Sequence, residues 1–261
     1  MNNKIQKMYT NLVQEKIDDF GFLFFKRTSC KKFKKVLRVN KIYFKLYPRF
    51  PQFSLKLKKN TKNNLLSSLK KCLVKRSSIR KSSKKDLSFR ELSVILYYSC
   101  GIKNFKKYSN DVDELIDKSK RFYPSAGARY PLEVYLGVFN VKNFSPGIYH
   151  YNVKWNTLEL LCKGNFAKLF GKKITNQNWI KKFKVVFILT AVFPRTTLKY
   201  KERGWRYIFI ETGHLAQNIY LLCAALNFNC CSIGGFIDDE VIKLLDLKEN
   251  VEVPIYLIAV G

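Results

Sequence analysis

The stretch RFYPSAGARYPLEVYLGVFN, residues 121–140, joins a turn-forming segment to a β-strand. Its first half contains small or turn-forming residues, namely Pro124, Ser125, Ala126 and Gly127. LEVYLGVF, residues 132–139, is rich in β-formers and predicts a strand directly after the turn. Small residues let the main chain approach a flat ligand closely, so the turn is a candidate binding loop. The alternative is an ordinary loop before a strand.

The sequence on the C-terminal side predicts more strands. KVVFILTAVF, residues 184–193, is a continuous apolar run and predicts a central, buried strand. GIYHYNV, residues 147–153, and LELLC, residues 158–162, flank a short turn and predict a hairpin. CSIGGF and VPIYLIAVG predict the last strands of the chain.

Two helices can be predicted from local patterns. Ser88 and Glu91 form a capping box, which predicts a helix over residues 89–100. Residues 207–227 are apolar almost all round and predict a buried helix, with one polar line at helical spacing: Glu211, His214 and Asn218. Protein groups or a bound ligand must satisfy that polar line. Because strands and helices do not alternate regularly, we expect an α+β fold and not a doubly wound sheet.

The charge divides the chain into two parts. The whole sequence has 49 Lys plus Arg against 19 Asp plus Glu, a net charge of +30, of which residues 1–85 carry +22 (25 basic minus 3 acidic). We expect a basic N-terminal arm over residues 1–75, irregular with one or two helical turns and a linker at 55–71, and a domain over residues 76–261. A basic arm could bind nucleic acid, anionic lipid or an acidic protein. We favour the simpler explanation, a general excess of lysine.

Several classes of protein are disfavoured. The longest apolar run is far shorter than the roughly 20 residues of a membrane-spanning helix, and no apolar segment of a secretory signal is visible. The seven cysteines include no C-x-x-C pair, so we expect neither a disulfide framework nor a zinc site, and a reducing compartment such as the cytoplasm. With only two histidines, no metal site is expected. The Rossmann and P-loop glycine motifs are missing.

Three other segments are candidates for chemistry. KRSSIR, residues 75–80, offers a compact anion clamp made of Arg76, Ser77, Ser78 and Arg80. Lys199 precedes Tyr200, which places two proton-transfer groups side by side, although most lysines in so basic a chain are solvated. Ile233 precedes Gly234 and Gly235, where the backbone can approach a ligand and a helix follows.

Residues 76–261 resemble the SagB-type dehydrogenases, the azoline-oxidising branch of the flavin-dependent nitroreductase superfamily. The resemblance rests on seven blocks in the same order: RSSIR, LSFRELSVILYYSCGI, RFYPSAGARYPLEVYL, PGIYHYN, LTAVFPRTTLKYKERGWRY, ETGHLAQNIYLLCAALNF and CSIGGFIDDEVIKLLDL. It implies a nitroreductase-like α+β fold with a central mixed or antiparallel sheet flanked by helices. It also implies an interwoven homodimer with FMN at the interface. One departure is Arg76-Ser77, where two adjacent basic residues often occur.

The resemblance also implies roles for the candidate residues. The FMN phosphate and ribityl chain would contact Arg76, Ser77, Ser78 and Arg80. The isoalloxazine ring would lie between two backbone stretches, Pro124–Gly127 on one side and Ile233–Gly235 on the other. Lys199 would remove a ring proton from the substrate. Tyr200 would be its partner, which orients the substrate or donates a proton to it.

The implied reaction is oxidation of thiazoline or oxazoline rings in a peptide or a small molecule, beside a cyclodehydratase partner. The alternatives are a general NAD(P)H-dependent flavin or nitro reductase, and a non-catalytic basic binding module on a flavin fold.

Overall fold

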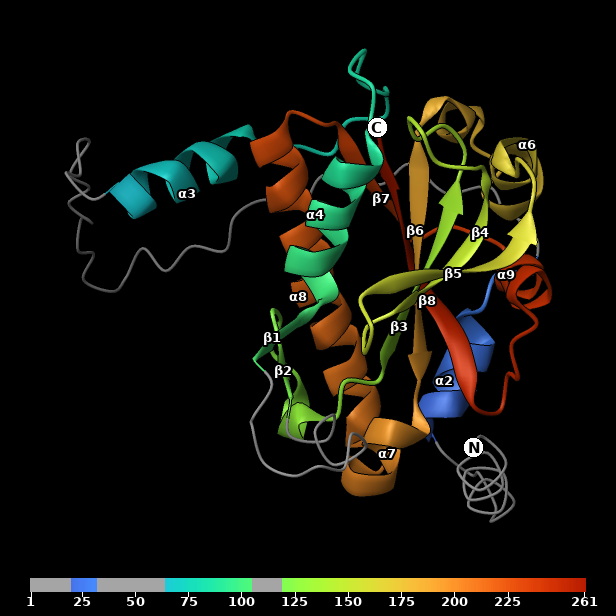
Figure 1. Cartoon of the computed structure of the whole chain (residues 1–261). Helices are drawn as coiled ribbons and strands as arrows, with labels where there is room; N and C mark the ends of the chain where they lie inside the picture. The colour runs from blue at the N-terminus through green and yellow to red at the C-terminus, as the bar shows by residue number, and fades with distance from the viewer. Residues whose placement is uncertain (1–19, 32–63, 105–118) are drawn as a thin grey trace, which may run out of the picture.

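The computed structural model describes residues 20–31, 64–104 and 119–261, and its centre is one six-stranded sheet (Figure 1). The strand order is β5-β4-β3-β6-β8-β7, and every neighbouring pair is antiparallel. The strands are β3 (Leu132–Val138), β4 (Gly147–Asn152), β5 (Thr157–Lys163), β6 (Val185–Val192), β7 (Cys230–Ile233) and β8 (Glu252–Val260). The predicted strands and the α+β class are confirmed.

Strand β6 lies between β3 and β8 inside the sheet, and all of its residues are buried. Its continuous run of β-branched and aromatic side chains suits a strand that is covered on both faces. At the edge of the sheet, the two thiols of Cys230 and Cys231 on β7 are buried and free, as expected for a strand edge in the core.

Helices cover both faces of this sheet (Figure 1). One face packs against α4 (Phe89–Cys100) and α8 (Arg203–Leu226), with Phe187 of β6 in that core. The other face packs against α9 (Asp238–Leu245) and the short helical segments α6 (Ala167–Leu169), η2 (Phe170–Ile174) and η3 (Asn178–Lys182). The sheet therefore separates two apolar cores.

The start of α4 forms the predicted capping box. The Ser88 hydroxyl accepts a hydrogen bond from the Glu91 amide, while the Glu91 carboxylate accepts one from the Ser88 amide. Lys85 pairs with the same carboxylate at 2.6 Å. Burial raises the pKa of Glu91, but Lys85 and Ser88 outweigh burial and bring the pKa down to about 2. The prediction of a helix over residues 89–100 is confirmed.

Helix α8 differs from its prediction on one face. Apolar residues surround it, as expected for a buried helix, yet Phe209 is 38% exposed and Ile210 is 50% exposed. The polar line also divides: Glu211 is buried, His214 is exposed, and the Asn218 amide donates to two backbone carbonyls. The prediction of burial all round is wrong at Phe209 and Ile210, because among the described residues Phe24 of the helix α2 (Phe20–Thr28) packs only against the edge of this face, with its ring centroid 6.2 Å from that of Phe209.

Part of the predicted linker is a helix. Residues 64–71 of that stretch belong to α3 (Asn64–Lys75), which projects from the body of the molecule (Figure 1). The linker prediction is wrong there, because leucines recur at helical spacing along good helix formers. Residues 55–63 lie outside the described part.

The second described piece of the arm, α2 (Phe20–Thr28), packs on α8. Phe25 is buried and stacks on Trp205 with ring centroids 6.3 Å apart. Beyond the helix, the Cys30 amide donates to the Asp238 carboxylate at 2.8 Å. Residues 1–19 and 32–63 of the predicted arm lie outside the described residues, and its boundary at residue 75 stays a prediction.

The loop expected over residues 103–120 begins and ends in short paired strands, β1 (Ile102–Asn104) and β2 (Lys120–Arg121). The expectation is wrong at these two ends, and residues 105–118 lie outside the described part. Within the described ranges, none of the helices combines the length and apolar character needed to cross a membrane.

Candidate active site

The predicted anion clamp lies along the edge strand β7. Ser78 pairs with Cys230 in a parallel bridge, and the Ile79 amide donates to the Cys230 carbonyl at 3.0 Å. The phenol of Tyr220 on α8 joins both segments, because its oxygen lies 2.9 Å from the Ser78 hydroxyl and accepts the Ser232 amide at 2.7 Å. The clamp and β7 are thus fixed to α8 by one tyrosine.

A polar cleft opens beside the clamp. Its volume is about 240 Å³, and its lining includes Lys75, Arg76, Ser77, Tyr220, Asn227 and Asn229. The Arg76 guanidinium lies over the Tyr220 ring, 5.6 Å from the ring centroid, and the Lys75 ammonium donates to the Asn227 side chain. Ser77 and Arg80 are exposed. The Arg76 guanidinium, the Lys75 ammonium and the hydroxyls of Ser77 and Tyr220 at this cleft are suited to binding a phosphate, and Arg80 lies outside its lining.

The glycine pair follows at the end of β7. Ile233 is buried, whereas Gly234 and Gly235 are exposed. A Cβ atom added at Gly235 would meet nothing within 4 Å, and one at Gly234 would meet only the Tyr256 ring at 3.7 Å. Packing within the chain therefore does not require glycine here, and the backbone is open to a ligand. We call this group, Arg76–Arg80 with Ile233–Gly235, the clamp half.

The turn that contains Gly127 contacts the predicted catalytic pair. Gly127 lies in η1 (Ala126–Ala128) with φ of 58°, and Lys199 and Tyr200 end α7 (Pro194–Tyr200). A Cβ atom at Gly127 would collide with the Tyr200 hydroxyl and would lie 3.3 Å from the Lys199 amine. Both side chains thus point at the turn. We call this group, Pro124–Gly127 with Lys199 and Tyr200, the loop half.

A carboxyl group that the sequence did not assign to the site lies beneath the loop half. Glu211 of α8 is 2% exposed, and its Oε1 atom has no hydrogen-bond partner. Burial raises the pKa of Glu211 to about 7, although Ser125 and the Arg121 guanidinium act in the opposite direction. The polar line on the predicted helix was the signal that could have identified this residue.

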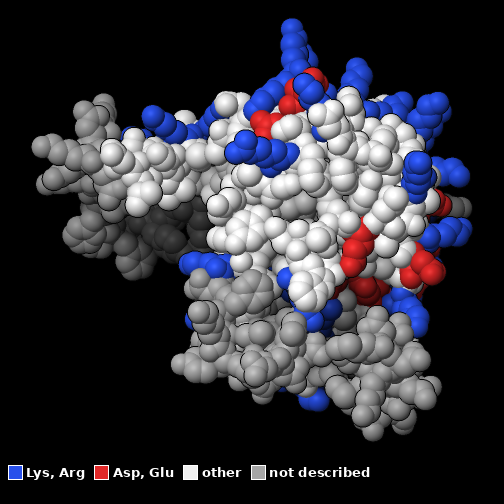
Figure 2. All heavy atoms as spheres, viewed as in Figure 1, with Lys and Arg blue, Asp and Glu red and all other residues white. Residues whose placement is uncertain are grey.

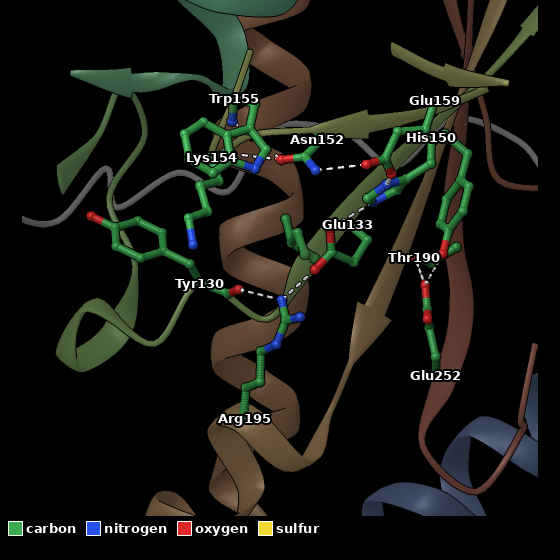
Figure 3. Close-up of polar contacts among 12 residues, drawn as sticks. Tyr130, Glu133, His150, Asn152, Lys154, Trp155, Glu159, Thr190, Arg195 and Glu252 are labelled. Atoms are coloured by element: carbon green, nitrogen blue, oxygen red, sulfur yellow. Dashed lines mark hydrogen bonds and ion pairs between the residues drawn. The ribbon is translucent and has the colours of Figure 1, made fainter. Parts of the chain in front are cut away.

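A second group missed in the sequence holds α7 in place (Figure 3). One Arg195 nitrogen lies 2.5 Å from the Glu133 carboxylate and donates to the Tyr130 carbonyl at 3.2 Å. In return, Arg129 donates to the Arg195 carbonyl at 2.8 Å. These bonds tie α7 to the segment that follows Gly127.

Charged residues continue this network into the sheet (Figure 3). The His150 ring has one nitrogen 3.2 Å from Glu133 and the other 2.8 Å from Glu159. Burial lowers the pKa of His150, but hydrogen bonds to the two carboxylates outweigh burial and raise it. Burial raises the pKa of Glu133, and Arg195 with His150 brings it down to about 2. Polar residues at alternate positions of β3 and β4 were the available sequence signal.

The two halves lie on opposite faces of α8. Tyr220 contacts Ser78 of the clamp half, and Ser125 of the loop half is among the groups that lower the pKa of Glu211. Nine residues separate them, about two and a half helical turns, so their side chains leave opposite faces roughly 13 Å apart along the axis. Each half is thus assembled within one chain, and the expectation that all four stretches enclose one flavin ring at a dimer interface stays a prediction.

Comparisons with known proteins agree with this fold. The family model described as the nitroreductase family matches residues 73–261. MJ1384 of Methanocaldococcus jannaschii, named for that family, is 33% identical over 193 residues, 74% of this chain and 90% of the relative. The microcin B17-processing protein McbC of Escherichia coli is 30% identical over 142 residues, 52% of this chain and only about half (52%) of McbC.

A solved structure shares this fold. The Escherichia coli microcin synthetase McbBCD complex, with truncated pro-MccB17 bound, includes a chain with a TM-score of 0.59 and 21% identity; the match covers 100% of this chain and 94% of that one. Proteins of the nitroreductase family bind FMN, and this agrees with the cofactor expected from the sequence. The antiparallel sheet, its flanking helices and the match over residues 73–261 lead to one conclusion: the chain belongs to the nitroreductase family.

Proposed function

We propose that this flavin oxidoreductase oxidises azoline rings in a peptide to aromatic azoles. The observation that carries the proposal is the position of the Lys199 amine and the Tyr200 hydroxyl against Gly127. Removal of a carbon-bound ring proton requires a base, and a lysine amine held against a ligand-binding turn can serve as one. A simple flavin reductase has no need of such a base.

FMN fits the two halves described above. Arg76, Ser77, Ser78 and Arg80 would hold its phosphate and ribityl chain, because the cleft of about 240 Å³ at Arg76 brings basic and hydroxyl groups together. Ile233–Gly235 would contact one side of the ring, and the open space beyond Gly235 supports that assignment. Pro124, Ser125, Ala126 and Gly127 would contact the other side.

A homodimer would bring the two halves together. They lie on opposite faces of α8 within one chain, so a complete site would take its clamp half from one protomer and its loop half from the partner. Two exposed apolar surfaces support this assembly: Phe209 with Ile210 on α8, and the leucines of α3, where Leu65 is 83% exposed. The projection of α3 from the body suits an interwoven dimer (Figure 1).

The chemistry of the chain's own residues follows from this arrangement. Lys199, as a neutral amine, would accept the proton from the ring carbon next to the carbonyl, and the Tyr200 hydroxyl would orient the ring. FMN, when bound, supplies the acceptor for the electron pair and the second hydrogen. The loss of two hydrogens makes the ring aromatic, which favours the product. The Arg195–Glu133 pair would keep the Lys199 amine in position.

A partner protein is part of the proposal. McbC is named for processing microcin B17, and the McbBCD complex contains a truncated precursor peptide. By analogy, we propose a peptide substrate whose azoline rings are formed by a cyclodehydratase acting beside this protein. We also propose the cytoplasm, or another reducing compartment, as its location, because the thiols of all seven cysteines are free.

A general NAD(P)H-dependent reductase is the second candidate, and the match to MJ1384, named as a nitroreductase, favours it. The third is a basic binding module. On the face drawn in Figure 2, Lys and Arg side chains of the described residues are scattered mostly around the rim and form no continuous patch, which gives this candidate no support.

Replacement of Lys199 tests the proposal. We expect Lys199→Ala to keep its bound FMN and to lose ring oxidation of a synthetic thiazoline peptide by at least about 100-fold, the usual contribution of a positioned base. Flavin absorbance and mass spectrometry of the peptide measure the two effects. The exposed neighbour provides the control, because Lys201→Ala should keep both properties.

Three outcomes would contradict the proposal. Full activity of Lys199→Ala would overturn the assignment of the base. A wild-type protein that leaves thiazoline peptides unchanged but consumes NAD(P)H rapidly with a nitroarene would be a general reductase. A protein that cannot be reconstituted with FMN would be a binding module.

A further inference from the structure

The helix α2 is fixed to the body of the protein through α8 and α9. Phe25 of α2 stacks on Trp205 of α8, with ring centroids 6.3 Å apart. Just beyond α2, the Cys30 amide donates to the Asp238 carboxylate at 2.8 Å, and the Asp238 amide donates to the Cys30 carbonyl at 3.3 Å. Asp238 is 7% exposed, which protects this link from water. The side chains of α2 therefore have a defined position relative to α8 and α9.

A cavity of about 220 Å³ lies between α2 and Gly234, the residue expected to contact the flavin. Four aromatic side chains line it: Phe24, Phe25, Phe209 and Phe236. The hydroxyls of Thr28 and Ser29, which also line it, donate to carbonyls of α2 itself. An engineered apolar cavity of about 150 Å³ holds benzene, so this cavity has room for one apolar side chain of a ligand. A helix of a second copy, about 10 Å across, is too wide for it.

A larger groove of about 590 Å³ follows α8 and meets this cavity at two aromatic rings. Phe24 and Phe209 line both spaces, and they are the residues that the two linings share. Their rings pack edge to face, with centroids 6.2 Å apart. A ligand group that reaches the cavity from the groove must therefore pass between Phe24 and Phe209.

We propose that Phe24 is a specificity-determining residue, which together with Phe209 admits one apolar side chain of the peptide substrate into the cavity beside Gly234. This inference rests on the proposed function, in which Gly234 contacts the flavin ring. An azoline ring placed on the flavin brings the next residue of the peptide close to Gly234, and the side chain of that residue enters the cavity. The peptide continues along the groove on α8. Asp238 is a positioning residue, because its link to Cys30 fixes α2 and hence Phe24.

Synthetic peptides with one thiazoline ring measure this selectivity in the whole protein. Within a series, the peptides differ only in the residue on one side of the ring, which is Gly, Leu or Phe, and a second series varies the other side. In one series, we expect wild type to prefer Leu or Phe to Gly by at least about tenfold in kcat/KM, because even one methylene group in an apolar pocket has an effect of that size. The preference should appear in KM, since the side chain binds away from the reacting atoms.

Replacement of Phe24 should remove this preference without affecting the chemistry. Phe24 is 46% exposed, so Phe24→Ala is expected to fold, to bind FMN as wild type does and to keep its kcat while the KM values for Gly, Leu and Phe peptides converge. Phe24→Trp narrows the passage and should raise the KM of the Phe peptide more than that of the Gly peptide. The matched control is Leu23→Ala, because Leu23 is equally exposed on α2 but lines neither space.

A second pair of variants tests how α2 is held. Asp238→Ala removes the acceptor of the Cys30 amide and should lose the same preference as Phe24→Ala. Asp239→Ala changes the exposed neighbour on α9 and should keep it. Circular dichroism establishes that each variant is folded, and the Phe24 variants decide the question if Asp238→Ala is not. A folded Asp238→Ala with the full preference would contradict the positioning role.

Three results would overturn the inference while leaving the proposed function intact. The first is a wild-type protein that oxidises all peptides of both series with equal kcat/KM. The second is a Phe24→Ala variant with the full preference of wild type. The third is a Phe24→Ala variant that becomes monomeric and loses FMN, which would make Phe24 part of a contact between two copies of the chain. A wild-type protein that oxidises none of the thiazoline peptides would instead contradict the proposed function.

Discussion

His150 illustrates how one side chain connects the strands to α7, the helix that carries Lys199. It lies between two carboxylates, Glu133 and Glu159, and Glu133 holds Arg195 of α7. A protonated imidazole donates to both carboxylates, whereas a neutral ring has one proton to share between them. The strength of this connection therefore depends on the protonation of His150.

Protonation of His150 predicts a pH dependence of stability. Its pKa is raised in the folded protein, so the folded state holds this proton more tightly than the unfolded state does. The contribution is complete below the ordinary histidine pKa of about 6.5 and is lost as the pH rises through the raised value. In urea unfolding, we expect the free energy of unfolding of wild type to fall more than that of His150→Gln between pH 6 and 8.5.

The second histidine of the chain is the matched control. His214 is exposed on α8, and His214→Gln should retain the wild-type pH dependence. If the free energy of unfolding changed equally with pH in wild type and in His150→Gln, the Glu133–His150–Glu159 contacts would not contribute to stability.

The start of α4 is set by a recognisable local signal, a capping box. Its capping box satisfies amides at the first turn that have no partner within the helix. The helix then buries Leu92, Ile95 and Leu96 in the core that it shares with α8. Its end also meets α8, because the Asn218 amide of α8 donates to the Ser99 carbonyl at 3.4 Å.

Removal of the cap should destabilise the whole domain. We expect Ser88→Ala to lower the free energy of unfolding by about 1 kcal/mol. Ser93 provides the comparison within the same helix, because its hydroxyl donates to the Phe89 carbonyl and alanine is favoured at an interior position. Chemical denaturation that finds Ser88→Ala as stable as Ser93→Ala would contradict this role for the cap.

The sequence predicted the elements of this molecule better than their assembly. The continuous apolar run identifies β6 as a strand that is buried on both faces. The capping box and the helical spacing of apolar residues identify α4. Both signals are local properties of the sequence. Exposure of Phe209 could not be predicted, since an apolar residue has the same signature whether it faces its own core or another protein. The Arg195–Glu133 pair was missed because its members are far apart in the sequence.

The candidate site shows the same limit. The motifs that contain Gly127 and Lys199 were identified separately by residue type and by resemblance. Their contact depends on how α7 follows β6, and this is a property of the tertiary fold. The separation of the clamp half from the loop half by α8 could not be deduced from either motif.

At the scale of the whole protein, the proposed function requires two copies of the chain, because each copy would complete the FMN site of the other. One chain contains both halves, on different faces of α8. In the proposed dimer, each FMN would lie between the clamp half of one protomer and the loop half of its partner. This arrangement would also cover the exposed apolar face of α8.

The FMN content of a mixed dimer tests this account most directly. One chain has Arg76→Glu and Arg80→Glu, which break its clamp half, and the other has Ala126→Trp, which blocks its loop half. The two chains are co-expressed with different affinity tags, and the mixed dimer is purified through both. Wild type should bind one FMN per chain, and each variant alone should bind none. The account predicts one FMN per mixed dimer with wild-type affinity, because one of its two sites is intact. A mixed dimer without FMN, when wild type binds it, would contradict the account, since both halves would then come from a single chain.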